Sequence, residues 1–85
     1  MSYEVQFTKS AQRQITKLPR PAREQVFSLA ASLAENPRPR GVVKLANRPG
    51  WRARVGDYRV IYTIEDAHLL VTVIHAGNRR EVYDR

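Results

Sequence analysis

The chain has 85 residues, no cysteine and a net charge of +7, with 15 Lys and Arg against 8 Asp and Glu. This length fits one domain with a modest core, which we expect to span residues 1–85, and a hydrophobic fraction of 42% argues against a disordered chain. The lack of cysteine excludes disulfides and thiolate chemistry and favours a reducing compartment. No run approaches the roughly 20 apolar residues of a membrane span, and the polar start MSYEVQFTKSAQRQ does not resemble a signal peptide. We therefore expect a cytoplasmic protein.

The first half of the chain predicts one strand and two helices. Residues 3–7 alternate apolar and polar side chains, as in a half-buried strand. A helix then begins near Thr8 or Ser10, either of which can cap it, and ends at the stretch LPRP. A second helix begins at the last proline of that stretch and ends at residues 36–37, Asn-Pro. The apolar stripes of the two helices are Ala11, Ile15 and Leu18, then Ala22, Val26, Leu29, Ala30 and Leu33.

The second half predicts three strands after a basic connector. Residues 36–50, NPRPRGVVKLANRPG, form this connector and contain a short extended piece at 42–45. Strands follow at 51–55, 58–64 and 69–75, and a two-residue turn, Gly-Asp, joins the first two. The order β-α-α-β-β-β predicts an α+β fold, in which an antiparallel twisted sheet carries an N-terminal helical hairpin on one face.

Arginine dominates the positive charge. Twelve of the 15 basic residues are Arg, whose planar guanidinium matches phosphate oxygens and stacks on bases better than the ammonium of Lys. We therefore expect a polyanionic partner, namely RNA, DNA or an acidic protein. A merely basic, solvated surface is the alternative.

The two-residue turn fixes which residues of the hairpin pair. Arg54 should oppose Arg59, Arg52 should oppose Ile61, and paired side chains point to the same side of a sheet. One face is then nearly all apolar and should take the helices: Trp51, Ala53, Val55, Tyr58, Val60, Tyr62 and Ile64. The other face carries Arg52, Arg54, Arg59, Ile61 and Thr63.

Three arginines on one short hairpin face need an explanation. Like charges directly opposite each other destabilise a sheet by a few tenths to about 1 kcal/mol, and no acid lies on this face within the predicted strands. Such a cluster is useful when an anion binds to it, so we expect a phosphate-binding face. A solvated basic face is the alternative.

The C-terminal stretch RREVY could extend this face. If it is extended, Arg79, Glu81 and Tyr83 share one side. Arg79 and Tyr83 would then join the arginines, where the tyrosine could stack on a base whose phosphate is gripped. Packing of Tyr83 on the edge of the domain is an equally open alternative.

The sequence lacks the residue patterns of several kinds of catalytic site. His68 and His75 are isolated and the acids are scattered, so we expect neither a metal nor a cofactor. We interpret His75 as a buried-edge histidine of the last strand. No Gly-rich phosphate loop and no Ser-His-Asp arrangement is visible. A metal-free route to RNA cleavage remains, in which the 2′-OH attacks the adjacent phosphate while arginines neutralise the developing charge.

Three stretches of the chain together resemble a known family. They are SAQRQITKLPRPAREQVFSLAASLAENP, KLANRPGWRARVGDYRVIYTIED and VIHAGNRREVY, and they resemble the RelE family of the RelE/ParE toxin superfamily over nearly the whole chain. The resemblance implies a toxin that enters the ribosomal A site and cleaves the mRNA there. The partners it implies are the ribosome with its rRNA, the mRNA and a cognate RelB-like antitoxin, with no membrane.

Carried over one position at a time, the resemblance implies a set of catalytic residues that the alternation had already placed on one face. They are Arg52, Arg54, Arg59, Arg79 and Tyr83. The choice between Arg79 and Arg80 stays open, because the spacing of this loop varies between relatives.

The sequence departs from the family in two places. Well-known relatives carry lysines where this chain has Arg52 and Arg54, and an arginine does not give up its proton to serve as a base. The candidates for a general base are Glu81, Tyr83 or no protein group at all. Many relatives also read HRR where this chain reads NRR, so an imidazole is missing at Asn78.

Further basic residues are expected to hold RNA phosphates away from the reacting bond. They are Lys9, Arg13, Lys17, Arg20, Arg23, Arg38, Arg40, Lys44 and Arg80.

Two rival functions remain beside the ribosome-dependent nuclease. One is a ParE-like inhibitor of DNA gyrase that cleaves no RNA, and the other is a non-catalytic basic module that binds RNA or protein.

Overall fold

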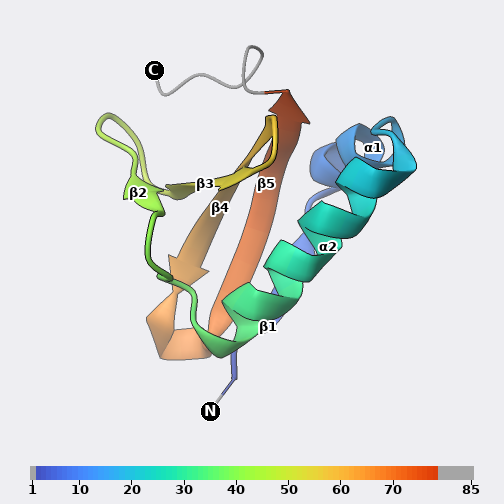
Figure 1. Cartoon of the computed structure of the whole chain (residues 1–85). Coiled ribbons are helices and arrows are strands. Elements are labelled where there is room, and N and C mark those ends of the chain that lie inside the picture. The colour runs from blue at the N-terminus through green and yellow to red at the C-terminus, as the bar shows by residue number, and fades with distance from the viewer. Residues whose placement is uncertain (1, 79–85) are drawn as a thin grey trace.

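The computed structural model describes residues 2–78, which form two helices and a five-stranded sheet (Figure 1). The helices lie together on one side of the sheet. A short 3₁₀ turn at Asp66–His68 joins the last two strands. The elements in chain order are β1 (Glu4–Phe7), α1 (Lys9–Thr16), α2 (Arg20–Glu35), β2 (Val43–Lys44), β3 (Trp51–Val55), β4 (Tyr58–Glu65) and β5 (Leu70–Asn78).

The predicted α+β class is confirmed, but the sheet is mixed. Its strand order is β1-β5-β4-β3-β2. Strand β1 pairs in parallel with β5, so the expectation of a wholly antiparallel sheet is wrong at this edge. The physical reason is that no short turn joins these two strands. Helices α1 and α2 lead from β1 to β2 at the opposite edge of the sheet, and the chain returns to β1 only after β3 and β4, so nothing forces β1 and β5 to run in opposite directions. The extended piece predicted at 42–45 forms β2, which pairs with β3.

The helix boundaries follow the local signals in the sequence. Thr8 caps α1, because its hydroxyl oxygen accepts a hydrogen bond from the backbone N–H of Ala11 at 3.1 Å. Helix α2 has a proline in its first turn and ends at Asn36, whose extended backbone precedes Pro37. Both predicted helices are therefore present. Thr8 rather than Ser10 caps α1, which ends at Thr16, before the predicted stripe residue Leu18.

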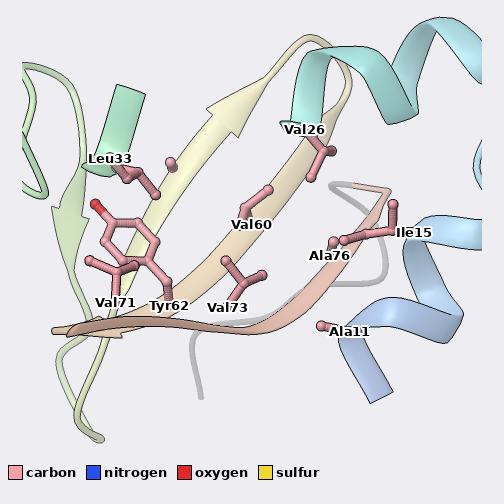
Figure 2. Close-up of a cluster of buried hydrophobic side chains, with 10 residues drawn as sticks. Ala11, Ile15, Val26, Leu33, Val60, Tyr62, Val71, Val73 and Ala76 are labelled. Carbon is pink, nitrogen blue, oxygen red and sulfur yellow. The ribbon is translucent and has the colours of Figure 1, made fainter. Parts of the chain in front are cut away.

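The core lies between the helices and the apolar face of the sheet (Figure 2). Val26 and Leu33 of α2 point toward Val60 and Tyr62 of β4. Ile15 of α1 lies beside Ala76 of β5. The buried cluster consists of Ala11, Ile15, Val26, Leu33, Ala53, Val60, Tyr62, Val71, Val73 and Ala76. The predicted apolar face of the hairpin therefore forms the sheet side of this core, apart from Tyr58, which does not belong to the cluster.

The β3–β4 hairpin has the predicted register. Arg54 pairs with Arg59, and Arg52 with Ile61. Gly56, the first turn residue, has a φ of +59°, which an L side chain rarely adopts. A β-carbon at Gly56 would also lie 3.1 Å from the Oε1 atom of Gln25 on α2. The turn geometry therefore favours glycine here, whereas the exposed side chain of Gln25 has to move only slightly to admit a β-carbon.

A cluster of polar contacts ties the connector to the rest of the fold. The guanidinium of Arg38 donates to both carboxylate oxygens of Asp66, at 3.1 and 2.8 Å, and lies 5.4 Å from the centre of the Trp51 ring. The hydroxyl of Tyr3 donates to the same carboxylate at 2.6 Å. Hydrogen bonds from Arg38, and then from Tyr3, lower the pKa of Asp66 to about 2. We call Tyr3, Arg38 and Asp66 the connector clamp.

No helix within residues 2–78 is long and apolar enough to cross a lipid bilayer.

Candidate active site

Strands β3 and β4 carry three arginines to the side of the sheet that faces away from the helices. The register places Arg52, Arg54 and Arg59 on this side, because Arg54 pairs directly with Arg59 and Arg52 follows two residues away on the same strand. Arg54 is exposed, whereas Arg52 and Arg59 are half-buried. We call these three residues the arginine face. The structure therefore brings together the three predicted site residues that fall within its described part.

A small apolar cluster supports the arginine face from the same side of the sheet. Ile61, the partner of Arg52, is fully buried against Leu45 and Ile74. The N–H of Leu45 donates to the carbonyl of Gly50 at 3.0 Å, which closes the loop between β2 and β3 over this cluster. The arginines are thus carried by strands that are packed on both faces, so their backbone is held firmly.

The end of β5 borders the arginine face. Gly77 pairs with Arg59, and Asn78 pairs with Tyr58. Gly77 is buried, so the backbone of β5 packs closely beside Arg59 at this point. The predicted residues Arg79, Arg80 and Tyr83, together with Glu81 as a candidate base, lie outside the described residues.

Metal ligands are not clustered in the part of the chain that the structure describes. Between residues 2 and 78 there is no group of three His, Cys, Asp or Glu side chains that could hold an ion. His75 is half-buried, as predicted for an edge position, and its Nδ1 atom lies 3.0 Å from the Nε2 atom of Gln14. The charge that this site offers to a ligand is therefore that of guanidinium groups.

The predicted RNA-binding residues divide into exposed groups and groups with structural partners. Within residues 2–78, no acid forms an ion pair with Lys9, Arg13, Lys17, Arg40 or Lys44, all of which are exposed. Arg20 pairs with Glu24 at 3.2 Å, and Arg23 donates to the carbonyl of Leu18 at 3.1 Å, at the end of α1. Arg38 belongs to the connector clamp.

One basic residue was missed by reasoning from the sequence. Arg48 lines a cavity of about 510 Å³ together with Arg38, Lys44 and Trp51. Lys44 pairs with Trp51, so this cavity lies at the β2 edge of the sheet, and none of the three residues of the arginine face lines it. The short stretch NRPG gave no periodic signal, which is why Arg48 was assigned only to a connector.

Comparison with known proteins identifies the family. A family model described as "ParE toxin of type II toxin-antitoxin system, parDE" matches residues 5–83. Toxin RelG of Mycobacterium tuberculosis is 33% identical over 87 residues, which cover 100% of both chains. Toxin RelE of the same organism is 36% identical over 83 residues, covering 95% of this chain and 86% of its own. The chain belongs to the RelE family of type II toxins.

Solved RelE structures share the fold of this toxin. The toxin in the RelBE2 complex of M. tuberculosis is 32% identical, with a TM-score of 0.84 and coverage of 93% of this chain and 100% of its own. The toxin in the archaeal RelE–RelB complex of Pyrococcus horikoshii is 27% identical, with a TM-score of 0.84 and coverage of 96% and 100%. The toxin in the RelBE complex of E. coli is 28% identical, with a TM-score of 0.80 and coverage of 91% and 96%. The RelE-like fold predicted from the sequence is confirmed.

Proposed function

We propose that this toxin is a ribosome-dependent endoribonuclease that cleaves mRNA in the A site without a metal ion. One observation carries the proposal: Arg52, Arg54 and Arg59 lie on the same side of two adjacent strands. Each planar guanidinium presents paired N–H donors, which suit the non-bridging oxygens of a phosphodiester. Membership of the RelE family supports this reading.

The reaction follows from the chemistry of RNA. The 2′-OH of one nucleotide loses its proton and its oxygen bonds to the adjacent phosphorus, while the bond from phosphorus to the 5′-oxygen of the next nucleotide breaks. The 5′-oxygen leaves with the bonding electron pair and takes a proton from water, so the products are a 2′,3′-cyclic phosphate and a 5′-OH. Negative charge builds up on the phosphoryl oxygens in the transition state, and preorganised guanidiniums stabilise that charge. Arg52, Arg54 and Arg59 are proposed for this role.

The remaining roles fall to residues near the C-terminus. Arg79, or Arg80 in its place, would stabilise charge on the leaving 5′-oxygen rather than donate a proton, because its pKa lies far above neutrality. Tyr83 would stack on or orient the nucleotide. Glu81 and Tyr83 are the protein candidates for the base, and ribosomal groups are the alternative.

Exposed basic residues away from the arginine face would hold rRNA phosphates. The candidates with no acidic partner among residues 2–78 are Lys9, Arg13, Lys17, Arg40, Lys44 and Arg48. Binding through such contacts releases counterions, so affinity for the ribosome should fall steeply with salt concentration.

A cognate antitoxin is the second proposed partner. The related toxins of M. tuberculosis, P. horikoshii and E. coli were solved in complexes with their antitoxins. In this chain, Phe27 is 52% exposed and packs edge-on against Phe7, with ring centres 6.0 Å apart. Both rings line a cavity of about 390 Å³ between the helices and β1. The exposed cations Lys9, Arg13 and Lys17 belong to the same helical hairpin, so we expect an acidic segment with apolar anchors to bind there.

The Phe27 surface can be tested against a matched residue. Val43 is the other large exposed hydrophobic residue of the described chain, at 46% exposure. We expect Phe27→Ser to weaken inhibition by the antitoxin about tenfold or more, from the apolar burial that is lost. Val43→Ser should leave inhibition nearly intact, and equal effects of both substitutions would argue against this docking surface.

Purified toxin added to programmed ribosomes tests the nuclease function. We expect 5′ ends to appear at A-site codons only when ribosomes are present, and the upstream fragments to end in a cyclic phosphate. A 2′-deoxy nucleotide at the cleavage position should block the cut, because it removes the attacking oxygen. Intact mRNA together with DNA damage would instead support the ParE-like gyrase inhibitor. If neither effect is observed, the non-catalytic binding module is the remaining function.

A further inference from the structure

Strand β5 extends beyond the point where its neighbour β1 ends. The parallel pairing of the two strands runs from Glu4 with Leu70 to Phe7 with Val73. The chain then leaves the sheet, and the N–H of Thr8 donates to the carbonyl of Val73 at 3.0 Å as α1 begins. Beyond Val73, the edge of β5 that β1 had covered lies against α1, which packs closely on this strand.

A glutamine on α1 takes over where β1 ends. The Oε1 atom of Gln14 accepts a hydrogen bond from the backbone N–H of Ala76 at 2.9 Å. Its Nε2 atom lies 3.0 Å from Nδ1 of His75. Ala76 is only 1% exposed, so its N–H needs a partner inside the protein. The side-chain amide of Gln14 thus replaces the peptide group that a longer β1 would have supplied.

The two hydrogen bonds fix the orientation of Gln14 and the protonation of His75. Because the N–H of Ala76 can only donate, it must face the oxygen of the amide, and the NH₂ group then faces His75. Nδ1 of His75 accepts this bond, so the neutral ring carries its proton on Nε2. Gln14 therefore holds two successive residues of β5.

These two residues lie where the register of β5 is least secure. The β4–β5 ladder is shifted by a bulge: Ile61 pairs with His75 and Tyr62 with Val73, which leaves Ile74 as an extra residue. A slip of one residue in a strand moves every side chain to the opposite face. Fixing Ala76 and His75 directly after the bulge sets the register of the strand end, where Gly77 pairs with Arg59.

We propose that Gln14 is a positioning residue for the arginine face. It acts through Ala76 and Gly77, which place the end of β5 beside Arg59, and it contacts no substrate itself. This inference rests on the proposed nuclease function. A helix on one side of the sheet thereby controls the geometry of a site on the other side.

Gln12 offers a matched control. It lies on the same helix, and its Nε2 atom donates to the carbonyl of Phe7 at 3.1 Å, so it also joins α1 to a strand. Its partner is in β1 rather than β5. Gln14→Leu removes both bonds to β5, whereas Gln14→Glu keeps an oxygen that can accept from Ala76. Gln12→Leu removes a bond of the same type elsewhere.

The test measures hydrogen exchange and cleavage kinetics of the full toxin, after thermal unfolding has shown that each variant folds. We expect Gln14→Leu to lower the protection of the Ala76, Gly77 and Asn78 amides about tenfold and to lower kcat on programmed ribosomes about tenfold or more, with little change in KM. Gln14→Glu should recover much of the kcat. Gln12→Leu should change neither quantity.

Two results would overturn the inference while leaving the nuclease function standing. The first is that the wild-type toxin cleaves mRNA and the Gln14→Leu variant cleaves it with the same kcat. The second is an equal loss of kcat and of protection in the Gln12→Leu control. A wild-type toxin that cuts no mRNA would overturn the nuclease function itself, and the exchange data would then show separately whether Gln14 holds the strand end.

Discussion

Tyr62 is the residue that joins the core to the connector. Its ring is fully buried, and its hydroxyl donates to the carbonyl of Pro37 at 2.8 Å. Burial raises the pKa of this phenol to about 12. The alternation of β4 predicted its place on the apolar face, but not its hydrogen bond, because a partner 25 residues away in a connector leaves no periodic trace in the sequence.

Replacing Tyr62 by Phe should destabilise the toxin by about 1 kcal/mol, because the buried carbonyl of Pro37 loses its donor. Tyr58→Phe is the control, since the hydroxyl of Tyr58 donates to no described residue. Urea denaturation measures both. Equal stability of the two variants would show that water replaces the missing donor.

At the scale of elements, the β3–β4 hairpin was the most predictable part of the fold. The two-residue turn and the alternation gave the pairing of Arg54 with Arg59, and the structure confirms it. The parallel pairing of β1 and the bulge in β5 were not predictable. Both depend on contacts between segments far apart in the chain, which local propensity and periodicity do not encode.

Gly56→Ala should destabilise the hairpin by about 1–2 kcal/mol, because a positive φ is unfavourable for a residue with a β-carbon. Asp57→Ala, at the neighbouring turn position, is the control and should change stability by less than about 0.5 kcal/mol. Thermal denaturation compares them. A Gly56→Ala variant as stable as the control would mean that the turn can change type without loss.

At the scale of the whole molecule, the connector clamp links three distant segments: the residue before β1, the connector and the β4–β5 turn. The pKa of Asp66 falls from 3.8 to about 2 on folding. A lowered pKa stabilises the fold above the unfolded value and loses that contribution as pH falls. The contribution of the clamp to the free energy of unfolding should therefore be complete above about pH 5 and should be lost between about pH 4 and pH 2.

Asp66→Asn separates this effect from general acid denaturation. The variant should be less stable than wild type at neutral pH, and the difference should shrink as pH falls toward 2. Chemical denaturation at several pH values measures it. If the difference in the free energy of unfolding between the two proteins stays constant over this range, the charge of the Asp66 carboxylate does not stabilise the fold.

The distribution of charge is also a property of the whole molecule. The composition predicted a polyanionic partner, and alternation predicted one arginine-bearing face. The sequence could not separate cations that are available for a ligand from those that hold the fold, because Arg38 and Arg23 reveal their roles only through tertiary contacts. Arg52, Arg54 and Arg59 are set apart from these by their shared place on one side of the hairpin.

The most direct test is a comparison of two double variants in single-turnover cleavage of mRNA on programmed ribosomes. Arg54→Ala with Arg59→Ala removes two charges from the arginine face, and Arg13→Ala with Arg40→Ala removes two exposed charges elsewhere. We expect the first pair to lower the cleavage rate at saturating toxin by about 100-fold or more, and the second chiefly to weaken ribosome binding. A folded Arg54→Ala/Arg59→Ala toxin that still cleaves at the wild-type rate would contradict the account.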